Sequence, residues 1–214
     1  MRFVLPPPAP ASVAVEGTEA RFAVRRIFCV GRNYAEHARE FGNDPDRDPP
    51  FFFTKPADAV VDSGTRVPYP PATAELHYEA ELVVALGPGG SVWGCAAGND
   101  LTRRDLQAEA KAMRRPWDMA KAFDASAVVG PLRPGPLPQG RICGVLNGTP
   151  RQQAQLSDMI WSVPEIIAHL SRLVTLAPGD LLFTGTPAGV GALVRGDRFT
   201  VEIDGLAPAV VTIG

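Results

Sequence analysis

Two glutamates separated by a single residue are the part of the sequence best suited to chemistry. Glu79 and Glu81 lie in a run that is otherwise largely apolar, LHYEAELVVAL. In a β-strand, side chains two residues apart point to the same face, so the two carboxylates would lie side by side. Two like charges at that distance are unfavourable unless one is protonated or a cation lies between them. The spacing indicates either a cation site or an edge strand whose glutamates face solvent.

Asp100 offers a third carboxylate, just before a segment with helical character. Three carboxylates with no paired His or Cys suit a hard divalent cation. We therefore expect Glu79, Glu81 and Asp100 to hold one Mg²⁺ or Mn²⁺, with water or substrate completing an octahedron. Because Glu-X-Glu is a common pairing, spacing alone leaves the solvent-facing alternative open.

His37 and Glu40 form a second candidate pair, in a predicted helix over 33–41 that has Asn33 as its N-cap. Residues three apart share a helical face, and a carboxylate beside an imidazole orients it and raises its basicity. Such a pair can deprotonate a water molecule. The alternative is an ordinary solvated face, since Glu36 and Arg39 are charged as well.

Four further residues have the chemistry to contact a substrate. Lys121 is flanked by apolar and aromatic residues, and a partly desolvated lysine can stabilise an enolate; a surface lysine is the alternative. Arg104 and Gln107 share a predicted helical face and could bind a carboxylate. Thr186 follows a predicted strand in a loop suited to an anionic group. We expect the other histidines, at positions 77 and 169, to be structural.

The elements that must position these residues are mostly strands. Apolar runs bounded by turn residues predict strands over 26–30, 51–53, 76–86, 181–183, 198–203 and 209–213. Helices are predicted over 101–113 and 162–173, the second with Ser162 as its N-cap. Residues 1–24 have the pattern of an N-terminal arm of short strands. Because helices do not alternate regularly with strands, we predict an α+β fold, with residues 1–214 as a single domain.

Composition and charge exclude several classes of protein. The 214 residues carry a net charge of −2 and no Lys/Arg-rich run, so the electrostatic footprint of a nucleic-acid binder is missing. No apolar run approaches the roughly 20 residues that cross a bilayer, and the proline-rich N-terminus lacks the pattern of a signal peptide. Three widely spaced cysteines indicate free thiols in a reducing compartment. We expect a cytoplasmic protein that binds neither nucleic acid nor membrane.

Eight motifs resemble those of the fumarylacetoacetate hydrolase family, in particular its small acylpyruvate hydrolases, which include fumarylpyruvate hydrolases. They follow the family's order through most of the chain: VGRNYAEHARE (30–40), FFFTKPADAV (51–60), LHYEAELVVALG (76–87), GNDLTRRDLQ (98–107), RPWDMAKAFDAS (115–126), LNGTPRQ (146–152), WSVPEIIAHLS (161–171) and GDLLFTGTPAGVG (179–191). The resemblance implies a strand-rich mixed β roll with few short helices, of the type of that family's C-terminal domain, and a homodimer.

The resemblance also implies a role for each candidate residue. The matched positions bind metal (Glu79, Glu81 and Asp100), catalyse (His37, Glu40 and Lys121) or contact the substrate (Arg104, Gln107 and Thr186). In the family the catalytic pair lies on a lid that orders over the substrate.

The function that the resemblance implies is hydrolysis of a carbon–carbon bond. A 2,4-dioxo acid, with fumarylpyruvate as the best candidate, would be cleaved to pyruvate and a carboxylic acid. Oxaloacetate decarboxylation and isomerisation of an unsaturated 2-oxo acid are alternatives on the same scaffold. A non-catalytic protein that binds a metal or a ligand is the alternative from a different class.

Overall fold

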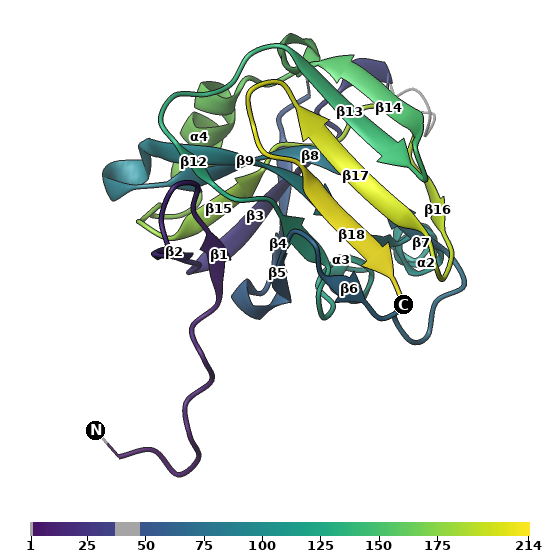
Figure 1. The fold of residues 1–214 in the computed structure, drawn as a ribbon, viewed down its shortest axis with the longest axis horizontal. Coiled ribbons are helices and arrows are strands. Elements are labelled where there is room, and N and C mark those ends of the chain that lie inside the picture. The colour runs from purple at the N-terminus through teal and green to yellow at the C-terminus, as the bar shows by residue number, and fades with distance from the viewer. Residues whose placement is uncertain (1, 37–47) are drawn as a thin grey trace.

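Strands dominate the structure, a computed structural model that describes residues 2–36 and 48–214 (Figure 1). The largest sheet has seven strands in the order β4-β3-β15-β8-β9-β11-β5, and an eighth, β12, pairs with β9. These strands are β3 (Arg26–Gly31), β4 (Phe51–Lys55), β5 (Val60–Asp62), β8 (Ala80–Leu86), β9 (Val92–Asp100), β11 (Ala127–Val129), β12 (Arg133–Pro134) and β15 (Asp180–Phe183).

Three smaller sheets and a few short helices surround this sheet. The five-stranded sheet, ordered β14-β13-β17-β18-β6, consists of β6 (Arg66–Val67), β13 (Arg141–Leu146), β14 (Thr149–Gln155), β17 (Arg198–Ile203) and β18 (Ala209–Ile213). The others are β10-β7-β16, with β7 (Leu76–Tyr78), β10 (Thr102–Arg103) and β16 (Gly191–Leu193), and the hairpin of β1 (Ser12–Ala14) and β2 (Arg21–Ala23). Apart from the helical residues 35 and 36, the α-helices of the described residues are α2 (Arg104–Ala112), α3 (Asp118–Lys121) and α4 (Val163–Ser171), and the 3₁₀ turns are η1 (Ala57–Ala59), η2 (Pro88–Gly90) and η3 (Leu156–Asp158).

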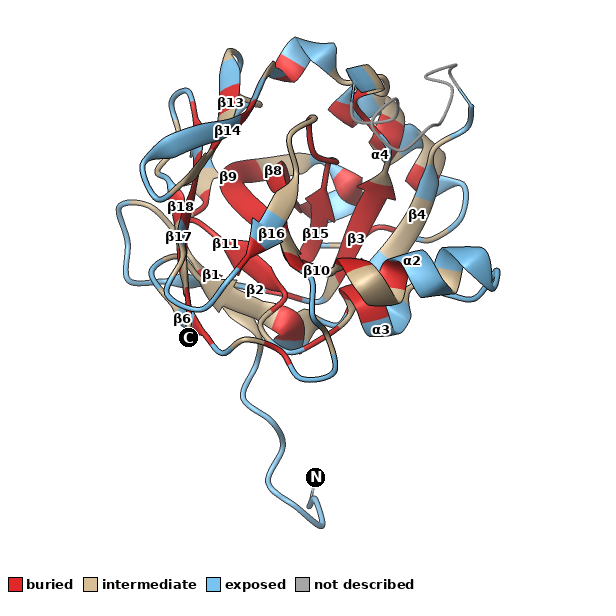
Figure 2. Cartoon of the chain, turned by 90° about the vertical axis from the view of Figure 1, so that its right-hand side faces the viewer, coloured by how far each residue is buried: buried red, intermediate tan, exposed pale blue. Residues whose placement is uncertain are grey.

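The central strands of the largest sheet are buried on both faces (Figure 2). Alternate residues of β8 belong to two apolar clusters, Leu82 and Val84 to one and Val83 and Ala85 to the other. The first cluster includes the inner face of the five-stranded sheet and α4, and the second includes β1 and β3. Burial on both faces explains why β8 is a continuous apolar run rather than an alternating one.

The structure confirms the predicted fold class, a strand-rich α+β roll with few short helices. The sheets are mixed, since β3 pairs in parallel with β15 and β5 with β11, while β8 and β9 are antiparallel. Strands occur at every predicted position, and short strands occur in the predicted N-terminal arm. Among the described residues, no helix is long and apolar enough to cross a membrane.

The single strand predicted over 76–86 is wrong, because the structure breaks it at Glu79. β7 pairs with β10 and β16, whereas β8 pairs with β9 and β15, so the two halves belong to different sheets. At the break, side chains accept hydrogen bonds from the backbone N–H groups. Asn99 Oδ1 accepts from the Glu79 N–H at 3.0 Å, and Gln152 Oε1 accepts from the Ala80 N–H at 2.9 Å. These two side chains replace strand partners where the chain changes sheet.

The helix predictions have mixed outcomes. α4 is confirmed, and Ser162 and Glu165 form a reciprocal capping box at its start. The helix predicted over 101–113 begins only at Arg104, because Thr102 and Arg103 pair with β7. Of the helix predicted over 33–41, residues 35 and 36 are helical and 37–41 lie outside the described residues.

Candidate active site

The three carboxylates meet where β8 begins and β9 ends. Glu81 lies opposite Gly98 in the antiparallel β8–β9 pair, and the Asp100 N–H donates to the Glu79 carbonyl at 2.9 Å. One ligand oxygen from each of Glu79, Glu81 and Asp100 lies within 4.8 Å of the others, and all three residues are buried. The predicted convergence is confirmed, and the alternative of two solvent-facing glutamates is wrong.

Three cations surround these carboxylates. Lys121 Nζ lies 2.6 Å from Glu79 Oε2 and 2.8 Å from Asp100 Oδ2. Arg104 pairs with Glu79 Oε1, and Lys55 Nζ lies 2.8 Å from Asp100 Oδ1. The positive charges offset much of the repulsion that three buried carboxylates would otherwise suffer.

Unlike Glu79 and Asp100, Glu81 forms no ion pair with the residues that the structure describes. Its Oε2 accepts a hydrogen bond from the Gly185 N–H at 2.7 Å. Burial raises the pKa of Glu81 well above its ordinary value, and Asp100 and Glu79 raise it further. For Lys121, burial lowers the pKa, but Asp100 and Glu79 outweigh burial, so the pKa is raised overall.

The donor set fits a hard divalent cation. Asp100 Oδ1 is fully buried and, despite its ion pair with Lys55, receives no hydrogen bond from the part of the chain that the structure describes. The three nearby side chains supply only carboxylate oxygens, the donors that Mg²⁺ and Mn²⁺ prefer. A cation among them would also relieve the repulsion that raises the pKa of Glu81.

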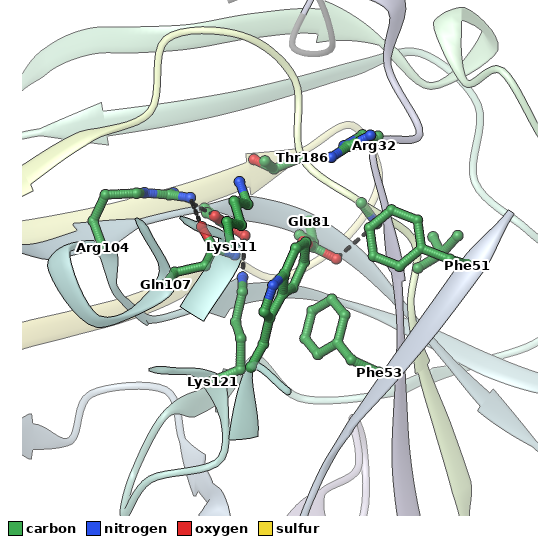
Figure 3. A pocket seen from close by; sticks show the side chains of 14 residues that line it. Arg32, Phe51, Phe53, Glu81, Arg104, Gln107, Lys111, Lys121 and Thr186 are labelled. Carbon is green, nitrogen blue, oxygen red and sulfur yellow. Dashed lines mark hydrogen bonds and ion pairs between the residues drawn. The ribbon is translucent and has the colours of Figure 1, made fainter. Parts of the chain in front are cut away.

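The carboxylates Glu79 and Glu81 lie on the wall of a pocket that opens to solvent (Figure 3). The pocket is lined by Val30, Gly31, Arg32, Phe51, Phe53, Glu79, Glu81, Arg104, Gln107, Lys111, Trp117, Lys121, Gly185 and Thr186.

The structure brings most of the predicted substrate-contacting residues to this pocket. Arg104 and Gln107 share a face of α2, and Arg104 Nη1 donates to Gln107 Oε1 at 2.6 Å. Thr186 follows β15 and accepts from Gln152 Nε2 at 2.7 Å. Lys121, at the end of α3, is buried, so the surface-lysine alternative is wrong. The predicted pair His37 and Glu40 lies outside the described residues.

Three buried residues that support the site are absent from the sequence-based candidates. Lys55 shares a strand face with Phe51 and Phe53, and this alternation is the signal that could have identified it. Gln152 forms hydrogen bonds both at the break between β7 and β8 and to Thr186 in the loop after β15. No local sequence pattern indicates this role.

Asn33 is the third supporting residue, and its amide does not cap the helix as predicted. Asn33 Nδ2 donates to the carbonyls of Trp161 and Thr184, and Oδ1 accepts from the Trp161 N–H. The side chain therefore joins the loop after β3 to the end of β15.

The contacts that the structure describes for His77, His169 and the three cysteines give none of them a role in the chemistry of the site. His77 Nδ1 accepts from Arg104 Nε at 3.4 Å, and burial, followed by Arg104, lowers the pKa of His77 to about 4. His169 packs edge-on against Trp161. The three cysteines are free, as expected.

The fold and the site together define a strand-rich α+β protein whose pocket wall carries three oxygen ligands suited to one divalent cation. The chain belongs to the fumarylacetoacetate hydrolase family: the family model described as "Fumarylacetoacetate (FAA) hydrolase C-terminal" matches residues 26–213.

Several proteins that are named as enzymes are similar in sequence and structure to this chain. A fumarylpyruvate hydrolase of Ralstonia sp. is 42% identical over 177 residues, which is 77% of this chain and 92% of the relative. The mitochondrial oxaloacetate tautomerase FAHD1 of Rattus norvegicus is 39% identical over 85% of this chain and 88% of its own. The crystal structure of a Pseudomonas aeruginosa fumarylpyruvate hydrolase with Mn²⁺ and pyruvate is 48% identical, with a TM-score of 0.95 and 99% of both chains covered.

Proposed function

We propose that the protein is a metal-dependent hydrolase that cleaves the C3–C4 bond of a 2,4-dioxo acid, with fumarylpyruvate as the best candidate. The observation that carries the proposal is the buried cluster of Glu79, Glu81 and Asp100, two of which line a pocket that opens to solvent. A solved relative that is 48% identical holds Mn²⁺ and pyruvate, and pyruvate is a product of the proposed reaction.

The three carboxylates would hold one Mg²⁺ or Mn²⁺ per chain. When bound, the cation acts as a Lewis acid that polarises the 2-oxo group of the substrate and favours the enolate of pyruvate. Arg104 and Lys121 pair with Glu79 and so hold its carboxylate in place. Arg104, Gln107 and Thr186 are the proposed contacts to the substrate.

The bond-breaking chemistry belongs to the chain's own acids and bases. His37, oriented by Glu40, is the proposed base that takes a proton from the water attacking the C4 carbonyl. When the C3–C4 bond breaks, its electrons pass to the pyruvate enolate, and Lys121 stabilises the developing charge. Protonation at C3 gives pyruvate, and the acyl part leaves as a carboxylate, fumarate for this substrate.

The test is product analysis with the metal-loaded protein. We expect fumarylpyruvate and Mn²⁺ to give equal amounts of pyruvate and fumarate by chromatography, and excess EDTA to stop the reaction. If the substrate is consumed without forming fumarate, or at the same rate in EDTA, the proposal is wrong.

A variant at position 37 tests the proposed base. His37→Ala should lower kcat by roughly 2–4 orders of magnitude, the usual contribution of general acid–base catalysis. Mn²⁺ affinity should change little, because His37 is not among the proposed ligands. Near-normal turnover by this variant would remove His37 from the mechanism.

Oxaloacetate tautomerisation is a second candidate function. The mitochondrial oxaloacetate tautomerases that match this chain, at 35–39% identity, support it. Tautomerisation needs proton transfer between C3 and the 2-oxygen but no attacking water and no carbon–carbon bond cleavage. Loss of the enol absorbance of oxaloacetate without release of pyruvate would identify it, and comparing kcat/KM with fumarylpyruvate would rank the two activities.

The remaining proposals concern the whole protein. We propose that residues 1–214 form one catalytic domain, that the protein is a homodimer, and that it acts in the cytoplasm on a product of aromatic-compound breakdown. The family resemblance supports the dimer. Sedimentation of the purified protein tests it, and a monomer at micromolar concentration would contradict it.

A further inference from the structure

Four cationic side chains line the pocket: Arg32, Arg104, Lys111 and Lys121. Arg104 and Lys121 are buried and bind Glu79, whereas Arg32 and Lys111 are exposed residues that line the same pocket. Figure 3 shows Arg32 and Lys111 at the end of the pocket where Thr186 lies. The pocket therefore has acidic groups on one wall and a second group of positive charges toward solvent.

The position of Arg32 is fixed by its neighbours. Its φ is +59°, in the left-handed region that residues other than glycine adopt at a cost of about 1 kcal/mol. The buried Asn33 amide, with its three hydrogen bonds to Trp161 and Thr184, holds the chain in this conformation. The guanidinium lies 5.5 Å from the Phe51 ring centre, and it forms no ion pair with any carboxylate of the described chain.

Lys111 continues the polar face of α2 from the metal site toward solvent. Arg104, Gln107 and Lys111 are spaced i, i+3 and i+7, which places them on one face over a rise of about 10 Å. Partial burial, followed by the nearby charges of Arg104 and Arg32, lowers the pKa of Lys111 to about 8. Cations that gather around a cavity despite their mutual repulsion suit an anionic ligand.

We propose that Arg32 and Lys111 bind a second carboxylate of the substrate, at the far end of its acyl group. The preferred substrates are then 2,4-dioxo acids with a terminal carboxylate on the acyl side. This inference rests on the proposed function, which places the first carboxylate and the 2-oxo group at the triad. A seven-carbon dioxo diacid extends about 7 Å between its end carbons, within the reach of this face of α2.

The aromatic walls of the pocket suit such a substrate. Phe51 and Phe53 line the same pocket, and the Trp117 ring lies 5.3 Å from Phe51 and 5.9 Å from Phe53. An unsaturated acyl chain is flat and apolar and can pack against these rings, while its terminal carboxylate remains within reach of the cations.

The test compares two substrates that differ in the terminal carboxylate. Fumarylpyruvate carries it and acetylpyruvate does not. In Arg32→Gln and Lys111→Gln, the ratio of kcat/KM for fumarylpyruvate to that for acetylpyruvate should fall about 10- to 100-fold, mostly through the KM for fumarylpyruvate, as expected when a hydrogen bond to a charged group is lost. Arg32→Lys keeps the charge and should restore part of the ratio.

Arg172→Gln is the matched control, because Arg172 is an exposed cation at the end of α4, outside the pocket. Its ratio should equal that of the wild type. An unchanged ratio in both pocket variants, or an equal fall in Arg172→Gln, would overturn the inference.

A binding measurement separates this inference from the proposed function. Calorimetry with fumarate and the Mn²⁺-loaded protein should show binding that weakens at least about 10-fold in Arg32→Gln and Lys111→Gln. If the wild type cleaves neither dioxo acid, the proposed function fails, and fumarate binding alone decides the carboxylate site. Equal fumarate affinity in the wild type and both variants would then refute it.

Discussion

At the scale of single residues, Glu81 links the metal site to pH. Its pKa is raised well above the ordinary value of 4.5, so between that value and the raised one the native state keeps a proton that the unfolded chain has lost. Because the native state binds more protons in this window, the free energy of unfolding of the metal-free protein should fall as the pH rises through it. A bound cation takes the place of that proton.

Glu81→Gln tests this linkage. In the metal-free protein, the fall in urea midpoint from about pH 5 to about pH 8 should be smaller in the variant than in the wild type. Between its lowered pKa of about 4 and its ordinary value of 6.5, His77 makes the free energy of unfolding rise with pH. Subtracting the curve of Glu81→Gln from that of the wild type removes this contribution, because both proteins contain His77. Identical pH dependence in both proteins would contradict the raised pKa.

Lys55 gives a second prediction at the residue scale. Its buried ammonium pairs with Asp100 and donates to the backbone carbonyls of Leu101 and Lys121. Lys55→Met leaves Asp100 with one fewer cation in a buried site, which should cost about 3–5 kcal/mol in urea unfolding.

The exposed pair of Arg21 and Asp62, also 2.8 Å apart, is the control for Lys55. Both of its side chains are about two-fifths exposed, so Arg21→Gln should cost less than about 1 kcal/mol. A similar loss of unfolding free energy in the two variants would show that burial of the Lys55–Asp100 pair does not increase its contribution to stability.

The sequence identified single residues best where one local rule applies. Strand alternation predicted that Glu79 and Glu81 would converge, even though the strand itself breaks between them. Residues whose partners are distant in the chain gave no such signal. Asn33, for example, bonds to Trp161 and Thr184, more than 120 positions away.

At the scale of elements, Gln152 on β14 holds the chain where it leaves β7 and enters β8. Its Oε1 accepts from Ala80, and its Nε2 donates to Thr186 Oγ1 and to the Pro187 carbonyl. Gln152→Leu leaves these buried groups without their partner. Since each unsatisfied group costs about 1–3 kcal/mol, we expect a loss of several kcal/mol in urea unfolding and weaker Mn²⁺ binding.

Gln153→Leu is the matched control, since Gln153 is adjacent but exposed. The change in its free energy of unfolding should stay within about 0.5 kcal/mol. A loss equal to that of Gln152→Leu would show that strand β14 is sensitive to any such change, rather than to the three hydrogen bonds of Gln152.

The elements themselves were mostly predictable from apolar runs and capping residues. Ser162 with Glu165 marks the start of α4, and the apolar run of β8 indicates a doubly buried strand. The break at Glu79 was not predictable, because it depends on Asn99 and Gln152, which lie elsewhere in the sequence.

At the scale of the whole molecule, the pocket is assembled from segments between Val30 and Thr186. The order of strands brings the ends of β3, β9 and β15 together beside the start of β8. This long-range order could not be derived from local patterns, whereas the family resemblance implied its outcome. The site depends on the complete sheet, so a variant that destabilises the sheet should also weaken metal binding.

The most direct test of the central claim is a Mn²⁺ titration of the metal-free protein followed by electron paramagnetic resonance. We expect one Mn²⁺ per chain, and affinity weakened at least about 10-fold in Glu81→Gln and in Asp100→Asn, since each variant removes one charged ligand. The exposed variant Glu202→Gln should bind as the wild type does. Unchanged affinity in both triad variants, or no bound Mn²⁺ in the wild type, would contradict the account.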